Sequence, residues 1–528
     1  MGKVYLGIEL GSTRIKAVLV DGNHQVVASG SHQWENVLEG GLWTYSLEAV
    51  WEGVRHSVGA LLDSCPGAID IGGIGVSAMM HGYLAFDDGG RLLTPFRTWR
   101  NTTTEVAAGA LTELFQFNIP QRWSIAHLYQ AMLDQEPHVG DIAFITTLAG
   151  YVHWQLTGEK ILGVGDASGV FPLDEAGYHR GMMGQFEGLN TYPWQLADIL
   201  PQVKMAGEAG GVLTPQGAAL LDPTGRIAPG IPLCPPEGDA GTGMVCTNSI
   251  GEGTGNISAG TSIFAMIVLE RPLSKVHMEI DMVTTPAGKP VAMVHCNNCS
   301  GDIDAWVRLF AENLALFGQT PTLDDLYKTL YLAALQGEAD GGGILTYNFF
   351  AGEPMIALEA GRPMLIREPN GRFTLANTMR SLVMSALGTL KIGMDILASE
   401  NVRLGKLLGH GGFFKSQGVG QQLMAAALEV PVSVMATAGE GGPWGMAVLA
   451  TYMAQKSPEQ TLEQYLAQVF ANEAATTIAP VQADVEGFRQ YMTHYVEGLV
   501  AARAAVPAEL TVESILPSRQ PKGTFPKD

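Results

Sequence analysis

The chain has 528 residues, of which 46% are apolar and only 16% are charged. A chain of this length and composition can bury a large core without a disulfide framework, and intrinsic disorder and coiled-coil architecture are excluded. Acidic side chains outnumber basic ones by 52 to 31, and the net charge is −21. Such a surface repels phosphate backbones and anionic lipid, which disfavours nucleic acid and membranes as partners. A small nucleotide held by local backbone N–H groups stays compatible with this charge.

The cysteines and the amino terminus indicate the compartment. The five cysteines are scattered, and Cys296 and Cys299 form a C-x-x-C without a second pair at zinc-finger spacing, so reduced packing thiols are expected. The chain runs from Met1 directly into a strand pattern, without the apolar segment of a signal peptide. No window offers the roughly 18 uninterrupted apolar residues that a membrane span needs. The sequence therefore predicts a soluble, cytoplasmic protein.

The first pattern along the chain is a repeated hairpin. Two apolar runs, Val4 to Leu10 and Ile15 to Val20, flank Gly11-Ser12-Thr13 and predict two strands with a tight turn. A second copy follows downstream, where the turn Gly260-Thr261-Ser262 precedes the apolar run Ile263 to Leu269. The two turns are nearly half the chain apart, and such a long period predicts two related domains rather than a solenoid.

The domain boundary is placed near residue 249, which gives domains of residues 1–248 and 249–528. Between the hairpins, helical and strand patterns alternate, as is typical of α/β domains. The last ten residues are rich in Pro, Lys and Arg and are expected to form a loose tail. The clearest predicted elements are a strand over Ile74 to Val76 and helices over Ser46 to Leu62, Ile125 to Leu133, Thr378 to Leu397 and Gln421 to Leu428.

The hairpin turns have the chemistry of a phosphate grip. A turn rich in Gly, Ser and Thr aims backbone N–H groups and hydroxyls at one point. Two copies at the heads of two similar domains would hold the phosphates of a nucleotide from both sides. The sequence has no Gly-x-x-x-x-Gly-Lys-Ser/Thr run and no well-formed Gly-x-Gly-x-x-Gly that opens a helix. A P-loop is therefore absent, and a dinucleotide fold is disfavoured.

Over almost its whole length the chain resembles the FGGY carbohydrate kinases, members of the superfamily of sugar kinases, actin and Hsp70. Leu6 to Lys16 resembles the first phosphate motif of that family and Ser258 to Ser262 the second, and Gly238-Asp239-Ala240-Gly241 resembles its catalytic Gly-Asp motif. The sugar-side segments lean toward the xylulokinase-like branch. Three segments resemble the sugar side of the family, namely Met80-His81-Gly82, Trp99-Arg100-Asn101 and Asp166-Ala167-Ser168-Gly169. Two segments resemble its adenosine side, namely Gly409-His410-Gly411-Gly412 and Gly439-Glu440-Gly441-Gly442.

The resemblance implies an α/β fold of two ribonuclease H-like domains flanking a central cleft, with ATP and Mg²⁺ as cofactors and a small-molecule sugar as substrate. The oligomeric state is left open, with a homodimer among the options. Sugar contacts are implied for Met80, His81, Trp99, Asn101 and Asp239. ATP contacts are implied for Gly11, Ser12, Thr13, Lys16, Gly260, Thr261, Ser262, Gly411, Gly412 and Lys415.

Transfer of a phosphoryl group to a hydroxyl needs a carboxylate that accepts the proton and a metal that spreads the phosphoryl charge. Asp239, expected in a glycine-rich turn, is the predicted general base and also a metal-side carboxylate. Glu9 lies in the first hairpin, where a carboxylate can hold Mg²⁺ through water, although the family usually has Asp there. Asn101 stands where xylulokinase-like members carry Asp, and an amide donates as well as accepts. The segment Trp123 to Leu128 departs from a Lys-containing signature of the family.

These observations predict an ATP-dependent kinase that phosphorylates a sugar hydroxyl. The first choice of acceptor is a ketopentose such as D-xylulose, and L-ribulose, a deoxyhexulose or a polyol are the alternatives. Two other functions stay open. One is an actin/Hsp70-like ATPase switch that binds a partner protein, which needs no base for a hydroxyl. The other is a non-catalytic sugar sensor derived from a kinase, which is kept open by Glu9 and Asn101.

Overall fold

The structure is a computed structural model, and it describes residues 2–65, 67, 69–189, 192–414, 416, 418–435 and 441–505. Its internal contacts divide the chain into two compact units. The first unit consists of Met1–His295 and Leu390–Pro480, and the second of Cys296–Thr389 and Val481–Asp528. The predicted domain boundary near residue 249 stays a prediction.

The first sheet contains the predicted amino-terminal hairpin. Its strand order is β13-β6-β1-β2-β3, in which β1, β2 and β3 are antiparallel and β6 and β13 run parallel to β1. Three antiparallel strands followed by two parallel ones give the ribonuclease H-like order. The strands are β1 (Val4–Leu10), β2 (Arg14–Asp21), β3 (Val26–Gln33), β6 (Ile71–Ala78) and β13 (Glu237–Gly238).

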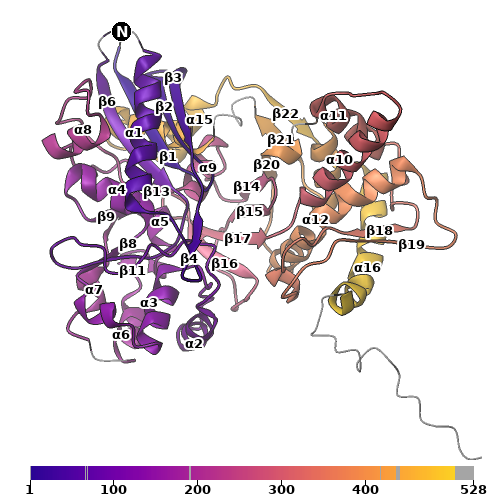
Figure 1. Ribbon diagram of the computed structural model, residues 1–528, viewed down its shortest axis with the longest axis horizontal. Coiled ribbons are helices and arrows are strands. Elements are labelled where there is room, and N and C mark those ends of the chain that lie inside the picture. The colour runs from indigo at the N-terminus through magenta and orange to yellow at the C-terminus, as the bar shows by residue number, and fades with distance from the viewer. Residues whose placement is uncertain are drawn as a thin grey trace, which may run out of the picture. The chain divides into compact units, whose positions relative to one another are not determined.

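Two helices pack on the first sheet, α1 (Leu47–Asp63) and α14 (Gly442–Gln455). Because side chains alternate along a strand, Leu6 and Ile8 of β1 enter the core cluster that contains α1, whereas residues on the other face meet α14. Helix α1 lies along β3 and β2, as Figure 1 shows. On the α14 side Gly7 allows close approach, because a Cβ at this position would overlap the backbone carbonyl of Pro443.

The second sheet repeats the arrangement of the first. Its order is β16-β17-β15-β14-β20-β21-β22, with β14 and β15 antiparallel and β20 and β21 parallel to β14. The five strands from β17 to β21 therefore have the same ribonuclease H-like order, which confirms the predicted fold class. The strands are β14 (Thr254–Ala259), β15 (Ile263–Val268), β16 (Ile280–Thr284), β17 (Pro290–Cys296), β20 (Lys406–His410), β21 (Val432–Met435) and β22 (Ala475–Ile478).

Shorter elements complete the two units, and the strand and the four helices that the sequence predicts outside the hairpins are all present. In the first unit these are β4 (Val37–Glu39), β5 (Leu42–Thr44), β7 (Leu84–Phe86), α2 (Glu105–Phe115), α3 (Ser124–Leu133), β8 (Phe144–Thr146), α4 (Leu148–Thr157), β9 (Ile161–Gly163), α5 (Val164–Ala167), β10 (Leu173–Asp174), β11 (Gly177–Tyr178), α6 (Arg180–Glu187), α7 (Leu196–Ile199), β12 (Gln202–Lys204), α8 (Pro215–Leu221), α9 (Asp239–Cys246), α13 (Val419–Leu428) and α15 (Leu462–Val469). The second unit holds α10 (Gly301–Leu316), α11 (Leu323–Ala334), β18 (Ile344–Tyr347), β19 (Met364–Arg367) and α16 (Gln482–Ala505), and α12 (Leu375–Ser399) belongs to both.

The helix α12 is the one described helix that is long and apolar enough to cross a membrane. However, 72% of its apolar window is buried inside the protein, which is typical of a core helix. The cysteines also behave as core residues. All five are free, and four of them are buried, so the expectation of packing thiols is confirmed.

The prediction of a glycine-rich turn around Asp239 is wrong, because Asp239 is the first residue of the helix α9. Glycine disfavours helices by about 1 kcal/mol, but here tertiary packing outweighs propensity. Every residue of α9 after Asp239 is buried, and α9 packs on α14. At the crossing, a Cβ on Gly445 would overlap the carbonyl oxygen of Thr242. The predicted carboxyl-terminal tail lies outside the described residues.

The contact between β1 and α14 predicts that Gly7→Ala destabilises the protein. The added methyl group has no room against Pro443, and overpacking of this kind costs about 1–3 kcal/mol. Gly59→Ala is the matched control, because Gly59 lies within α1 and no atom would lie within 4 Å of the new methyl group. Thermal unfolding should show a lower Tm for Gly7→Ala and an equal or higher Tm for Gly59→Ala. Equal melting temperatures for both variants would contradict the close approach of β1 and α14.

Candidate active site

Three parallel strands bring the predicted catalytic and sugar-side residues together. In β1, β6 and β13, Leu10 and Gly238 both pair with Ala78, so the carboxyl ends of the strands meet at one edge of the sheet. Glu9 is the penultimate residue of β1, the Met80-His81 turn follows β6, and Asp239 follows β13. In open α/β sheets this is the edge at which ligands bind.

Asp239 is an accessible carboxylate at this edge. Its Oδ1 atom accepts a hydrogen bond of 3.0 Å from the backbone N–H of Met80. Asp239 keeps solvent-accessible surface, but protein atoms crowd around its carboxylate. Desolvation therefore raises the pKa of Asp239 to about 6, and backbone hydrogen bonds, first from Met80 and then from Ala240, oppose the rise. The group is reachable by a substrate and can accept a proton near neutral pH.

Glu9 is a second carboxylate beside Asp239. It is partly buried and lies opposite Lys16 in the first hairpin. Burial, and next the charge of Asp239, raise the pKa of Glu9 to about 8, whereas Lys16 lowers it. The Oε2 atom is buried without a hydrogen-bond partner among the described residues. A cation would relieve both the repulsion and the unpaired oxygen.

This pair of carboxylates fits the way proteins bind Mg²⁺. The described part of the chain holds no group of three or more His, Cys, Asp or Glu side chains that could hold a metal ion. Mg²⁺ usually binds to one or two carboxylates together with substrate phosphates, rather than to a cage made by protein alone. Glu9 and Asp239 therefore fit a magnesium ion that arrives with a nucleotide.

The first phosphate turn is held in place by two aromatic side chains. The indole of Trp34 donates a hydrogen bond of 2.7 Å to the carbonyl oxygen of Gly11. The hydroxyl of Tyr45 donates one of 2.6 Å to the carbonyl oxygen of Ser12. Thr13 is exposed at the tip of the turn. The turn is thus held in place through its carbonyl oxygens, whereas a phosphate is bound by N–H groups and hydroxyls.

The second turn lies against the predicted adenosine segment. The N–H of Gly260 donates to the carbonyl oxygen of Ser262 at 2.9 Å, and Thr261 is exposed. Gly411 has a φ of 99°, and a Cβ there would overlap the carbonyl oxygen of Ala259, so only glycine fits. Gly412 follows and is exposed. Lys415, Gly439 and Glu440 lie outside the described residues.

His81 is fixed on the sugar-side turn with a defined tautomer. Its ring stacks on that of Trp123 with centroids 6.3 Å apart, and its Nδ1 atom lies 3.3 Å from the carbonyl oxygen of Gly169. A carbonyl oxygen only accepts, so Nδ1 carries the proton. Burial, and next the charge of Arg122, hold the pKa of His81 well below its usual 6.5. The ring is therefore neutral at pH 7, and Nε2 is left as a hydrogen-bond acceptor.

Asn101 and Trp99 lie in a nearby loop with their own protein contacts. The Oδ1 atom of Asn101 accepts from the N–H of Trp43 at 2.8 Å, and its Nδ2 atom donates to the carbonyl oxygens of Trp43 and Thr98 at 2.9 and 3.0 Å. A sugar contact by Asn101 would have to share or replace one of these bonds. Trp99 is partly buried and packs on the core cluster that contains α1. The predicted sugar contacts of both residues stay predictions.

Two buried acids next to Asp239 had no predicted role as individual residues, although Asp166 belongs to the predicted sugar-side segment Asp166-Ala167-Ser168-Gly169. Asp166 accepts a 2.6 Å hydrogen bond at Oδ2 from the hydroxyl of Thr147, and its Oδ1 atom has no partner among the described residues. Burial is the main cause that raises the pKa of Asp166 to about 7 and that of Glu237 to about 8. For Glu237, the one signal in the sequence was its position directly before the Gly-Asp motif. Nothing in the sequence shows that Glu237 contacts residues about 70 positions away.

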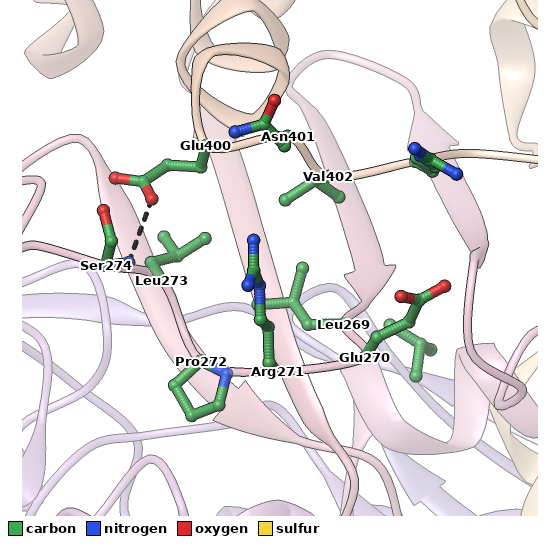
Figure 2. Close-up of a pocket in the computed structure, with 11 residues that line it drawn as sticks. Leu269, Glu270, Arg271, Pro272, Leu273, Ser274, Glu400, Asn401 and Val402 are labelled. Atoms are coloured by element: carbon green, nitrogen blue, oxygen red, sulfur yellow. Dashed lines mark hydrogen bonds between the residues drawn. The ribbon is translucent and has the colours of Figure 1, made fainter.

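A separate pocket of about 290 Å³ lies at the other end of β15, away from the Gly260 turn (Figure 2). In it Glu400 accepts a hydrogen bond from the N–H of Ser274 at 2.9 Å, and its other carboxylate oxygen lies 2.7 Å from Nε2 of His277. Arg271 extends into the space between the two lining segments (Figure 2). The lining includes none of the predicted catalytic, sugar or ATP residues.

Two sheets with the ribonuclease H-like strand order, each containing a hairpin with a Gly/Ser/Thr turn, give the fold seen in solved sugar kinases. The family model for the N-terminal domain of the FGGY carbohydrate kinases matches residues 4–246, and that for the C-terminal domain matches residues 255–454. The chain belongs to the FGGY family of carbohydrate kinases. It is accordingly an enzyme that phosphorylates a sugar with ATP as the donor, and the predicted family and enzyme class are confirmed.

The similar proteins are named for more than one substrate. A xylulose kinase of Haemophilus influenzae is 22% identical over 93% of this chain and 99% of its own length. The solved xylulose kinase of Lactobacillus acidophilus has a TM-score of 0.77 at 17% identity and covers 96% of this chain and 99% of its own. The solved gluconate kinase of the same organism has a TM-score of 0.79 at 17% identity, with 95% and 99% covered. The shared fold thus does not decide which sugar is used.

The packing around Glu9 predicts that Gly442→Ala impairs activity. A methyl group at this first residue of α14 would overlap Oε2 of Glu9 and displace the carboxylate. We expect a kcat at least about tenfold lower, because displacements of about 1 Å can cost ~10²-fold. In the Gly442→Ala background, Glu9→Asp shortens the side chain and should restore part of kcat. Gly251→Ala is the control, since its methyl group meets no atom within 4 Å. Steady-state kinetics that show no defect in Gly442→Ala would contradict this geometry.

Proposed function

We propose that the protein transfers the γ-phosphoryl group of ATP to a hydroxyl of a small ketose in the cytoplasm. D-xylulose is the first choice, and L-ribulose, a deoxyhexulose or a polyol are the alternatives. The observation that carries the proposal is Asp239. Its carboxylate is accessible, has a raised pKa and is tied to the sugar-side turn by the N–H of Met80. A general base must be within reach of the hydroxyl and have a pKa near the operating pH, and the bond from Met80 fixes its position.

On the nucleotide side, the two Gly/Ser/Thr turns would hold the phosphates through their N–H groups and hydroxyls. Glu9 and Asp239 would hold Mg²⁺, which when bound neutralises charge on the transferred phosphoryl group. The residues proposed for ATP are Gly11, Ser12, Thr13, Lys16, Gly260, Thr261, Ser262, Gly411, Gly412 and Lys415.

On the sugar side, Met80 and His81 form the turn that carries Asp239. In this proposal Nε2 of His81 accepts a hydrogen bond from a sugar hydroxyl, because Nδ1 is already used by Gly169. Trp99 and Asn101 complete the proposed sugar side. Since Asn101 is bonded to Trp43, it would contribute by sharing an amide hydrogen or oxygen with the sugar.

The two other functions that the sequence left open are an ATPase switch and a non-catalytic sensor, and the match to the FGGY family models argues against both. Neither requires an accessible carboxylate with a raised pKa at the end of a strand, whereas a hydroxyl kinase does. ADP release measured with a panel of ketoses, polyols and aldonates would separate them. A switch would hydrolyse ATP regardless of the sugar, and a sensor would bind a sugar without releasing ADP.

The role of Asp239 predicts the outcome of Asp239→Asn. The amide cannot accept the proton of the sugar hydroxyl, and loss of a general base typically lowers kcat by ~10²–10⁴-fold. The affinity for ATP, measured by calorimetry, should change by less than about threefold. Asp88→Asn, at an exposed loop position, is the matched control. If Asp239→Asn kept more than about a third of the wild-type kcat, Asp239 would not be the base.

The tautomer of His81 predicts its behaviour with pH. Because its folded-state pKa is held well below 6.5, the ring should stay neutral when the pH falls from 7.5 to 6.5. Long-range ¹⁵N NMR of histidine-labelled protein should show Nδ1 protonated and Nε2 unprotonated throughout this range. A His81→Gln sample identifies the signal. A His81 that titrates near 6.5, or that carries its proton on Nε2, would remove the proposed acceptor.

A further inference from the structure

Glu237 is a buried carboxylate with no role in the proposed reaction. It is 1% exposed and belongs to the two-residue strand β13, directly before Asp239. Its Oε1 atom accepts a hydrogen bond of 3.3 Å from the N–H of Gly165, and its Oε2 atom accepts one of 3.0 Å from the N–H of Asp166. Both donors are backbone groups of α5. Glu237 therefore ties the catalytic strand to a turn about 70 residues earlier in the chain.

The segment around α5 is shaped to receive this side chain. A Cβ on Gly163 would overlap Oε1 of Glu237, and a Cβ on Gly165 would overlap Oε2. Neither glycine has a positive φ. Backbone conformation thus does not demand glycine at these positions. At Gly165 the three nearest atoms all belong to Glu237, so space for the carboxylate is the requirement, whereas at Gly163 a Cβ would also come within 2.7 Å of the carbonyl oxygen of Pro236.

The same segment also reaches the sugar-side turn. The carbonyl oxygen of Gly169, two residues after α5, faces Nδ1 of His81. Asp166 lies behind the catalytic motif, because its Oδ1 atom would be 3.3 Å from a Cβ on Gly238. The α5 segment therefore contacts both the strand that carries Asp239 and the ring proposed to bind the sugar.

Few other hydrogen bonds position β13. The strand pairs with β6 over two residues only, Glu237 with Ser77 and Gly238 with Ala78, and it lies at the edge of its sheet. The other close restraints include the bond from Met80 to Asp239, the bond from the N–H of Gly163 to the carbonyl oxygen of Pro236, and the long bond of 3.5 Å from the hydroxyl of Thr242 to the carbonyl oxygen of Gly238. The two bonds to Glu237 hold one oxygen of the carboxyl group each, so they fix the direction of the side chain as well as its distance from α5.

We propose that Glu237 is a positioning residue that sets the separation of Asp239 from the sugar bound at His81, through its two hydrogen bonds to α5. The proposal rests on the proposed function, since it takes Asp239 as the base and His81 as the sugar contact. Glu237 itself touches no substrate, because its carboxylate is enclosed by the glycines of α5 and by the strand.

The first test is Glu237→Gln. The amide keeps the shape of the side chain, but its NH₂ group must face one of the two backbone N–H groups, so one bond is lost. We expect kcat to fall at least about tenfold and the KM for the sugar to change, with the KM for ATP within about twofold of wild type. All rates are measured at least about 15 °C below the Tm of each variant, so that unfolding does not contribute. A role in stability alone would lower Tm and leave kcat and both KM values unchanged.

Glu353→Gln is a matched control within the same chain. Glu353 is fully buried, and its carboxylate also accepts hydrogen bonds from two backbone N–H groups, of Asn297 at 3.3 Å and of Asn298 at 3.2 Å. It lies in the second unit, which contains none of the predicted site residues. Glu353→Gln should lower Tm by a similar amount with kcat unchanged. A similar loss of kcat in both variants would overturn the specific role of Glu237.

Gly165→Ala tests the same contact from the other side and decides the matter if Glu237→Gln does not fold. The new methyl group should displace the carboxylate and lower kcat in the wild-type background. In the Glu237→Ala background the space is free, so Gly165→Ala should have no further effect, which makes the two changes strongly non-additive. Independent effects of the two changes would overturn the proposal.

Asp239→Asn separates this proposal from the proposed function. If Asp239→Asn keeps its activity, the assignment of the base fails, and with it the basis for positioning. If Asp239→Asn is inactive while Glu237→Gln has wild-type kinetics, the base is supported and the positioning role alone is overturned.

Discussion

Parallel pairing of β1, β6 and β13 is the constraint on which the candidate active site depends. It brings three strand ends from distant parts of the chain to one edge of the sheet, with Glu9, His81 and Asp239 on or just after them. Close packing of α14 on β1, which requires Gly7, then sets Gly442 against the carboxylate of Glu9. The geometry of the site is thus a consequence of backbone packing, and the side chains occupy positions that the sheet has already fixed.

Burial divides the acidic groups at this edge into two kinds. Asp239 is exposed and Glu9 is partly buried, whereas Asp166 and Glu237 are enclosed. Desolvation is the largest cause of the raised pKa in all four, and their mutual repulsion adds to it in three of them, Asp239 being the exception. A carboxyl group removed from water must be hydrogen-bonded or neutral. The enclosed pair can organise the backbone, and only Asp239 and Glu9 are placed to meet a ligand.

The sequence was sufficient to predict what is determined locally. Gly/Ser/Thr turns between apolar runs predicted both hairpins, and helical spacing predicted α1, α3, α12 and α13 within a few residues. The helix beginning at Asp239 was missed, because its glycines are tolerated only through packing on α14. The link from Glu237 to α5 could not be predicted, since it joins residues about 70 positions apart. The bonds of Asn101 to Trp43 were hidden for the same reason.

The repeated hairpins share their antiparallel pairing but not their chemistry. In the first hairpin Glu9 pairs with Lys16 across the strands, and in the second Ser258, at the same distance before the turn glycine, pairs with Phe264. Of the two turns, the first alone can therefore offer a carboxylate to a metal ion, and the second offers uncharged N–H and hydroxyl donors. A phosphoryl group in transfer needs a metal on one side and neutral or positive donors around its oxygens. In the proposed function, a duplicated backbone with one charged and one uncharged turn would meet both needs, so the asymmetry of the repeat would matter as much as the repeat itself.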